Sequence, residues 1–89
     1  MLRITPAAKN VETVTLKLEG KIHGEWASLL EQECFRLVHQ QKQVRLDFSG
    51  VSYVDPEGIQ VVRNLLNGHI QIINCPRFIV ELLDRGGQP

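Results

Sequence analysis

The sequence contains few of the residues that usually indicate covalent or metal chemistry. Only two of its 89 residues are cysteines, Cys34 and Cys75, and they lie far apart with no metal-ligand spacing. We therefore expect two free thiols, with neither a disulfide framework nor a metal site. Because Cys34 falls within a helical pattern, a small buried core residue is a more usual role for it than a reactive thiol.

An excess of charge of one sign is also missing. Ten basic and ten acidic residues give a formal net charge of zero, and no cluster of lysine and arginine stands out. Neither a nucleic acid nor an anionic membrane surface is therefore expected as a partner. The first residues lack the apolar core of a signal peptide, and no run approaches the roughly 20 apolar residues of a membrane span. We expect a cytoplasmic protein without membrane insertion.

Residues that could catalyse a reaction are present but scattered. The histidines, at positions 23, 39 and 69, fit no helical zinc pair, no serine lies in a nucleophile elbow, and no glycine-rich phosphate loop occurs. We therefore expect no enzymatic activity and no cofactor. For Asp47 we favour hydrogen bonding to the following loop over a catalytic role, and for His39 a solvated position at a helix C-terminus.

The sequence does contain a regular alternation of strand and helix patterns. Its 89 residues, 43% of them hydrophobic, predict one small domain over residues 1–89 with one core. Strand patterns cover residues 2–5, 13–19, 44–48 and 69–74. The first two strands should form a hairpin across a loop at 7–10, with Pro6 ending the first strand or placing it at an edge and Gly20 closing the second.

Three segments have the period of an amphipathic helix. The first runs from about Glu25 to Gln40, and the second starts at Pro56 and stops at 67–68. The third follows Pro76. Phe35 projects away from the apolar stripe of the first helix, so it lies either under a neighbouring loop or in solvent. The expected buried faces are Trp26, Leu29, Leu30, Cys34, Leu37 and Val38 in the first helix, Ile59, Val62, Leu65 and Leu66 in the second, and Phe78, Ile79, Leu82 and Leu83 in the third.

The order of these elements predicts an α/β fold. Strands that alternate with helices are usually parallel and joined by right-handed crossovers. The polar and apolar alternation within each strand predicts that one face of the sheet is more covered than the other. The expected architecture is a small mixed sheet of four strands with three helices.

The segment 44–66, VRLDFSGVSYVDPEGIQVVRNLL, joins the third strand to the second helix. Gly50 interrupts the strand pattern. Asp55 is a preferred N-cap residue and Pro56 suits the first helical position, while an acidic Glu57 in the first turn favours the helix dipole. These residues predict a helix that begins at Pro56.

The motif LDFSGVSYVDPEGIQVV resembles the central signature of STAS domains, the fold of bacterial anti-sigma factor antagonists. LKLEGKIHGEWASLLEQE upstream and HIQIINCPRFIVELL downstream are similar to further elements of the same family, so the resemblance covers nearly the whole chain. It implies a STAS-like fold and a non-enzymatic role in regulation through protein–protein interaction. The residues that match the signature position by position are Asp47, Ser49, Gly50, Val51, Asp55 and Gly58.

The sequence departs from this family at one functional position. The family signature has Ser-Ser where this chain has Pro56 and Glu57, and a partner kinase phosphorylates a serine there to switch the domain between binding partners. We therefore expect no phosphorylation in the loop 55–58. Glu57, at the phosphoserine position, is either a constitutive mimic of the phosphate or part of a good helix start, and we favour the second. A switch through Ser49 or Ser52 is an alternative, although neither occupies the motif position.

The resemblance also implies a protein partner, such as a kinase or an anti-sigma factor. One alternative is a stable adaptor role as a subunit of a lipid-transport ATP-binding cassette complex. Another is a sensor of small anions or nucleotides that binds them at the helix N-terminus near Pro56. The expected partner contacts lie in the loop and on the exposed side of the following helix, at Asp55, Pro56, Glu57, Gly58, Gln60 and Arg63.

STAS domains usually continue with another strand and a final helix, for which this sequence has no matching segments. The sheet is then expected to have an open edge, and apolar side chains such as Ile73, Val80 and Phe35 would lose cover. We therefore expect either a homodimer with two-fold symmetry or docking on a larger subunit, with Phe35 in the interface.

Overall fold

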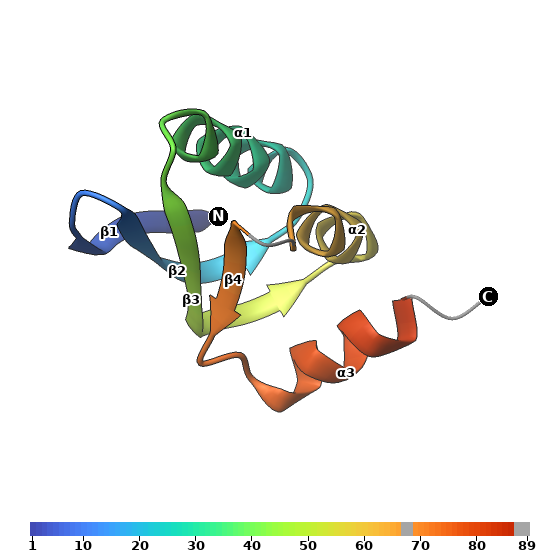
Figure 1. Ribbon diagram of the computed structural model, residues 1–89. Coiled ribbons are helices and arrows are strands. Elements are labelled where there is room, and N and C mark those ends of the chain that lie inside the picture. The colour runs from blue at the N-terminus through green and yellow to red at the C-terminus, as the bar shows by residue number, and fades with distance from the viewer. Residues whose placement is uncertain (67–68, 87–89) are drawn as a thin grey trace.

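The computed structural model describes the backbone of residues 1–66 and 69–86 and the side chains of residues 1–66 and 69–84. This part of the chain forms four strands and three helices, as predicted (Figure 1). In chain order they are β1 (Leu2–Lys9), β2 (Thr13–Ile22), α1 (Glu25–His39), β3 (Gln43–Val54), α2 (Pro56–Leu65), β4 (Ile70–Ile73) and α3 (Arg77–Gly86).

The strands form one mixed sheet in the order β1-β2-β3-β4. β1 and β2 make the predicted antiparallel hairpin, whereas β3 is parallel to both β2 and β4. The two parallel connections run through α1 and α2. As a result, β2 and β3 end side by side, and α1 and α2 begin at the same edge of the sheet.

One face of the sheet is covered by helices and the other is open. α1 and α2 lie together over the same face (Figure 1). α3 packs beside α2, and its Ile79 is fully buried in the core. The strand residues under the helices are apolar and buried: Val14, Leu16, Leu18, Val44, Leu46, Phe48 and Ile70. Their neighbours on the open face are polar, among them Thr5, Lys17, Arg45 and Gln71. The predicted difference between the two faces is confirmed.

β2 and β3 are longer than the sequence pattern predicted. β2 does not close at Gly20 but continues to Ile22, and β3 continues through Gly50 to Val54. The pairing of β2 with β3 shifts register twice, once between Lys17 and Glu19 and once between Gly20 and Lys21. A Cβ on Gly50 would lie 2.9 Å from the carbonyl oxygen of Leu18, so this glycine permits a close approach between paired strands instead of ending one.

The first strand was also predicted too short. β1 passes through Pro6 to Lys9, with an irregular register between Pro6 and Ala8. The loop predicted at 7–10 is therefore wrong, because pairing with β2 extends the strand beyond the proline. Pro6 does lie in an edge strand, as expected.

The helices begin where the sequence predicted, at Glu25 and Pro56, and α1 ends at His39, one residue before the expected Gln40. α2 ends at Leu65, and its predicted stop at 67–68 lies outside the described residues. The strand predicted at 69–74 is observed over the shorter range Ile70–Ile73. These differences affect only the ends of the elements.

Most of the residues predicted to line the buried helix faces do so, but four are exposed: Leu29, Leu66, Phe78 and Leu82. In α1 the small Ala27 is buried while Leu29 lies at the edge of the stripe. Leu66 lies beyond the end of α2. The two exposed α3 residues are four positions apart and share a side of the helix that points away from the core.

Phe35 is exposed, which decides between the two positions that its pattern allowed. Its place in an interface stays a prediction. Cys34, next to it, is fully buried, and this burial, with smaller contributions from Glu33 and Glu31, raises the pKa of its thiol to about 12. Cys34 is thus an inert core residue, as expected, and Cys75 is a second free thiol.

Within the described ranges, β4 has no neighbour on its outer side, which agrees with the predicted open edge. None of the helices in these ranges has the length and hydropathy needed to span a bilayer.

Candidate functional site

The predicted site lies where β3 ends and α2 begins. Ile22, the last residue of β2, pairs with Val54, the last residue of β3. The amide of Asp55 then donates to the carbonyl oxygen of Ile22 at 3.1 Å. The turn that leads into α1 and the turn that leads into α2 are therefore held side by side.

The Asp55 carboxylate joins these two turns. Its Oδ1 accepts a hydrogen bond from the Gly58 amide at 2.6 Å, and its Oδ2 accepts one from the Gly24 amide at 3.2 Å. The first bond is the predicted N-cap of α2. The second reaches the N-cap residue of α1, which has no side-chain cap of its own. One carboxylate thus serves the start of both helices that cover the sheet.

Gly58 lets α2 approach the end of β2 closely. It is buried, and a Cβ at this position would lie 2.6 Å from the carbonyl oxygen of Ile22 and 2.8 Å from a methyl group of Val54. The first of these atoms belongs to the backbone and cannot move aside without shifting the strand. Gly58 therefore has a structural role, as Asp55 does.

The two residues between them point into solvent. Pro56 occupies the first position of α2 and Glu57 follows it in the first turn, and both are exposed. Gln60 is exposed one turn later, and Arg63 is partly exposed. The six predicted contact residues therefore divide into two that hold the turn, Asp55 and Gly58, and four that form its outer surface. We call these four, Pro56, Glu57, Gln60 and Arg63, the α2 surface.

A shallow groove lies beside the α2 surface, between α2 and α3. Pro56, Gln60 and Arg63 line it together with Tyr53 from β3 and Leu82 from α3. Tyr53 is 46% exposed and Leu82 is 37% exposed, so the groove presents apolar surface to solvent. Sequence reasoning missed both residues. The alternation in β3 could have placed Tyr53 on the outer side, but only the packing of α3 brings Leu82 to the groove.

Over residues 1–66 and 69–84, no three His, Cys, Asp or Glu side chains come together in a way that could hold a metal ion. His39 lies exposed at the end of α1, as expected.

The family model described as "Mlab, STAS domain" matches residues 6–87. The chain belongs to the STAS domain family. The structure of the anti-sigma factor antagonist SpoIIAA in its unphosphorylated form is similar, with a TM-score of 0.71 and 15% sequence identity over 94% of this chain and 84% of that one. At this identity the match shows a shared fold. A search of curated protein sequences found no match.

The other acidic residue of the STAS signature, Asp47, lies on the open face of the sheet. Its Oδ1 accepts a hydrogen bond from the Ser49 amide at 2.9 Å. The Ser49 amide and hydroxyl are the main groups that lower the pKa of Asp47, and the Asn74 side chain and the Lys17 ammonium add to this effect. The Asp47 carboxylate thus accepts local hydrogen bonds, as the sequence predicted, although Ser49 belongs to the same strand and not to a loop.

Replacing Asp55 with alanine should lower the free energy of unfolding by about 1 to 2 kcal/mol, because it removes the cap of α2 and the acceptor for the Gly24 amide. Asp55→Asn keeps a side-chain oxygen that can cap α2, so its free energy of unfolding should fall clearly less than that of Asp55→Ala. Urea denaturation followed by circular dichroism measures both variants. Equal losses would contradict the assignment of the effect to these hydrogen bonds.

The lowered pKa of Asp47 predicts a pH dependence of stability. A carboxyl with a lower pKa in the folded chain than in the unfolded chain stabilises the fold while ionised, and this contribution is lost as the pH falls through the folded pKa. Asp47→Asn should therefore flatten the loss of unfolding free energy below about pH 4. Denaturation series at decreasing pH compare the variant with the wild type, and parallel curves would disprove the prediction.

Proposed function

We propose that this STAS domain is a protein-binding module whose partner contacts the α2 surface, and whose binding is not switched by phosphorylation at the Glu57 position. The proposal rests on one observation: in this turn, residues that the fold holds in place flank residues that are exposed to solvent. Asp55 and Gly58 are held by the fold, whereas Pro56 and Glu57 between them are exposed. Membership of the STAS family supports a protein-interaction module.

The groove beside the α2 surface supports a protein as the partner. Protein interfaces commonly place aromatic and aliphatic side chains at their centre and polar ones at the rim. Here the exposed Tyr53 and Leu82 lie next to Gln60 and Arg63. A partner that inserts an apolar side chain into this groove would cover Tyr53 and Leu82 and could reach Gln60 and Arg63 with polar groups.

The chemistry of the turn supports binding without a phosphorylation switch. Neither Pro56 nor Glu57 has a hydroxyl group, and Asp55 is engaged by two backbone amides. The nearest serines lie in β3, where the Ser49 hydroxyl bonds to Asp47 and the Ser52 hydroxyl donates to the carbonyl oxygen of Gly20 at 3.2 Å. We favour Glu57 as a helix-start residue over a phosphate mimic, because one carboxylate carries less charge and fewer acceptor oxygens than a phosphate.

A stable subunit of a lipid-transport ATP-binding cassette complex is the second candidate. The missing phosphoacceptor favours it, since a permanent subunit needs constant binding. A sensor that binds anions at the start of α2 is less favoured, because Asp55 already accepts from the Gly58 amide and Glu57 adds negative charge there. The identity of the bound protein distinguishes the first two candidates.

Glu57→Lys should abolish partner binding and lower the free energy of unfolding by no more than about 1 to 2 kcal/mol, because the side chain is exposed and the charge reversal acts on the fold only through the dipole of α2. Affinity purification from native lysate with mass spectrometry compares it with Glu12→Lys, which makes the same charge change on an exposed residue of the hairpin at the other end of the sheet. A protein captured by the wild type and by Glu12→Lys, but lost with Glu57→Lys, is the expected result.

Retention of that protein by Glu57→Lys would contradict the proposed surface. A captured ATPase subunit would select the second candidate, and a kinase or an anti-sigma factor the first. Intact mass after incubation with ATP and any captured kinase should stay unchanged, and a phosphate located between positions 55 and 58 would contradict the absence of a switch.

A further inference from the structure

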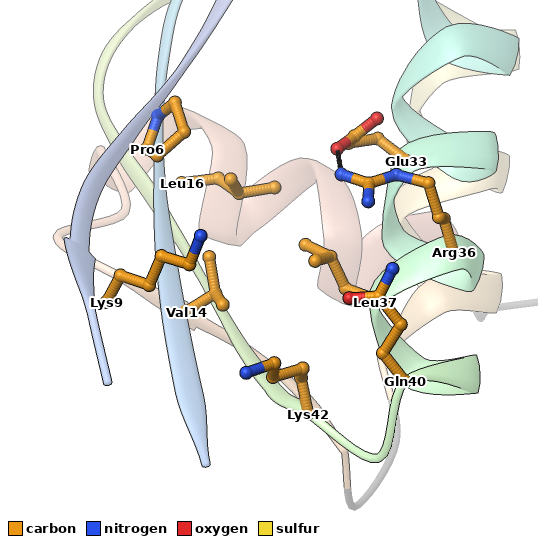
Figure 2. A pocket seen from close by; sticks show the side chains of 9 residues that line it. All are labelled: Pro6, Lys9, Val14, Leu16, Glu33, Arg36, Leu37, Gln40 and Lys42. Carbon is orange, nitrogen blue, oxygen red and sulfur yellow. Dashed lines mark hydrogen bonds and ion pairs between the residues drawn. The ribbon is translucent and has the colours of Figure 1, made fainter. Parts of the chain in front are cut away.

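A second concave site lies at the opposite end of the sheet, between α1 and the β1–β2 hairpin (Figure 2). It is a small cavity of about 100 Å³. Its residues come from the end of α1, the start of β2, the edge strand β1 and the segment before β3. None of them belongs to the α2 surface, so this site is independent of the function proposed above. We call it the hairpin pocket.

The floor of the hairpin pocket is apolar. Val14 and Leu16 of β2 and Leu37 of α1 line it, and all three are buried side chains of the core. Pro6 of β1 adds a further apolar wall. An occupant that reaches the floor therefore needs an apolar part, because a polar group there would lose its hydration without gaining a hydrogen bond.

The rim of the pocket is mainly basic. Lys9, Arg36 and Lys42 contribute three cations, against the single carboxylate of Glu33. Glu33 forms an ion pair with Arg36, which leaves the two lysines uncompensated. Although the formal net charge of the chain is zero, the rim of this pocket therefore carries excess positive charge, which favours an anionic ligand.

The two lysines retain hydrogen-bond donors that an anion could use. The Lys42 ammonium donates to the carbonyl oxygen of Val11 at 2.9 Å, which anchors it to the hairpin and leaves two of its N–H groups available. The Lys9 ammonium forms no ion pair with any residue in the described part of the chain. Figure 2 shows both lysines and the Gln40 amide around the apolar floor.

We propose that the hairpin pocket binds a small organic anion, a carboxylate that carries a short alkyl group. The alkyl group would contact Val14, Leu16 and Leu37, and the carboxylate would accept hydrogen bonds from Lys9 and Lys42. The volume sets the size of the part that enters the pocket: an apolar cavity of about 150 Å³ takes benzene, so one of about 100 Å³ fits a ligand of propionate size. Inorganic phosphate would match the rim but not the floor.

A titration of the ¹⁵N-labelled chain with sodium propionate, followed by amide chemical shifts, tests this inference. We expect saturable shifts at Val14, Leu16 and Leu37, and weaker binding of inorganic phosphate at equal ionic strength. A titration with sodium chloride is the control for shifts that arise from ionic strength alone. Linear shifts equal to those with chloride, or phosphate binding as tight as propionate binding, would overturn the proposal.

A matched pair of variants on α1 tests the position of the anion. Gln40→Glu adds a carboxylate at the rim, and Gln32→Glu makes the same change on an exposed part of the same helix outside the pocket. Propionate affinity should fall by about tenfold or more in the first and stay within about twofold in the second. Lys9→Met, at an exposed side chain, should weaken binding as well. Equal affinities of both glutamine variants would contradict the proposed site.

Discussion

The bridge made by the Asp55 carboxylate is the interaction on which the arrangement of this domain depends. β2 and β3 end side by side, so the helices that follow them must start side by side. Each helix start has backbone N–H groups without intrahelical partners. Asp55 accepts from one such group in α2 and from the amide of Gly24, the N-cap residue of α1. The close approach that Gly58 allows makes both bonds attainable with one short side chain.

This constraint separates residues that the fold holds from residues that it leaves exposed, within four consecutive positions. Substitution of Asp55 or Gly58 is therefore expected to disturb the packing of the helices on the sheet. The fold places fewer constraints on Pro56 and Glu57. A proline suits the first helical position and an acid suits the first turn, but neither side chain is held by contacts with the core.

Local signals made much of this structure predictable from the sequence. The N-cap at Asp55, the helix start at Pro56 and the uneven coverage of the sheet all follow from residue types and short-range periodicity. Contacts between distant segments were not predictable. The bond to Gly24 spans 31 residues, β3 continues through Gly50 because β2 pairs with it, and Leu82 is exposed because no described element packs over its side of α3. Each of these depends on tertiary structure, to which a sequence pattern gives no direct access.

Amide hydrogen exchange at Gly24 and Gly58 tests the bridge most directly. In the wild-type chain both amides should be protected from exchange, and Asp55→Ala should increase the exchange rate of both. Amides at the centre of β3 should change only by the amount that the lower free energy of global unfolding accounts for. Faster exchange at Gly58 alone, with the Gly24 amide equally fast in both proteins, would contradict the account. Asp55 would then cap only one helix, and the two turns would be held together by other contacts.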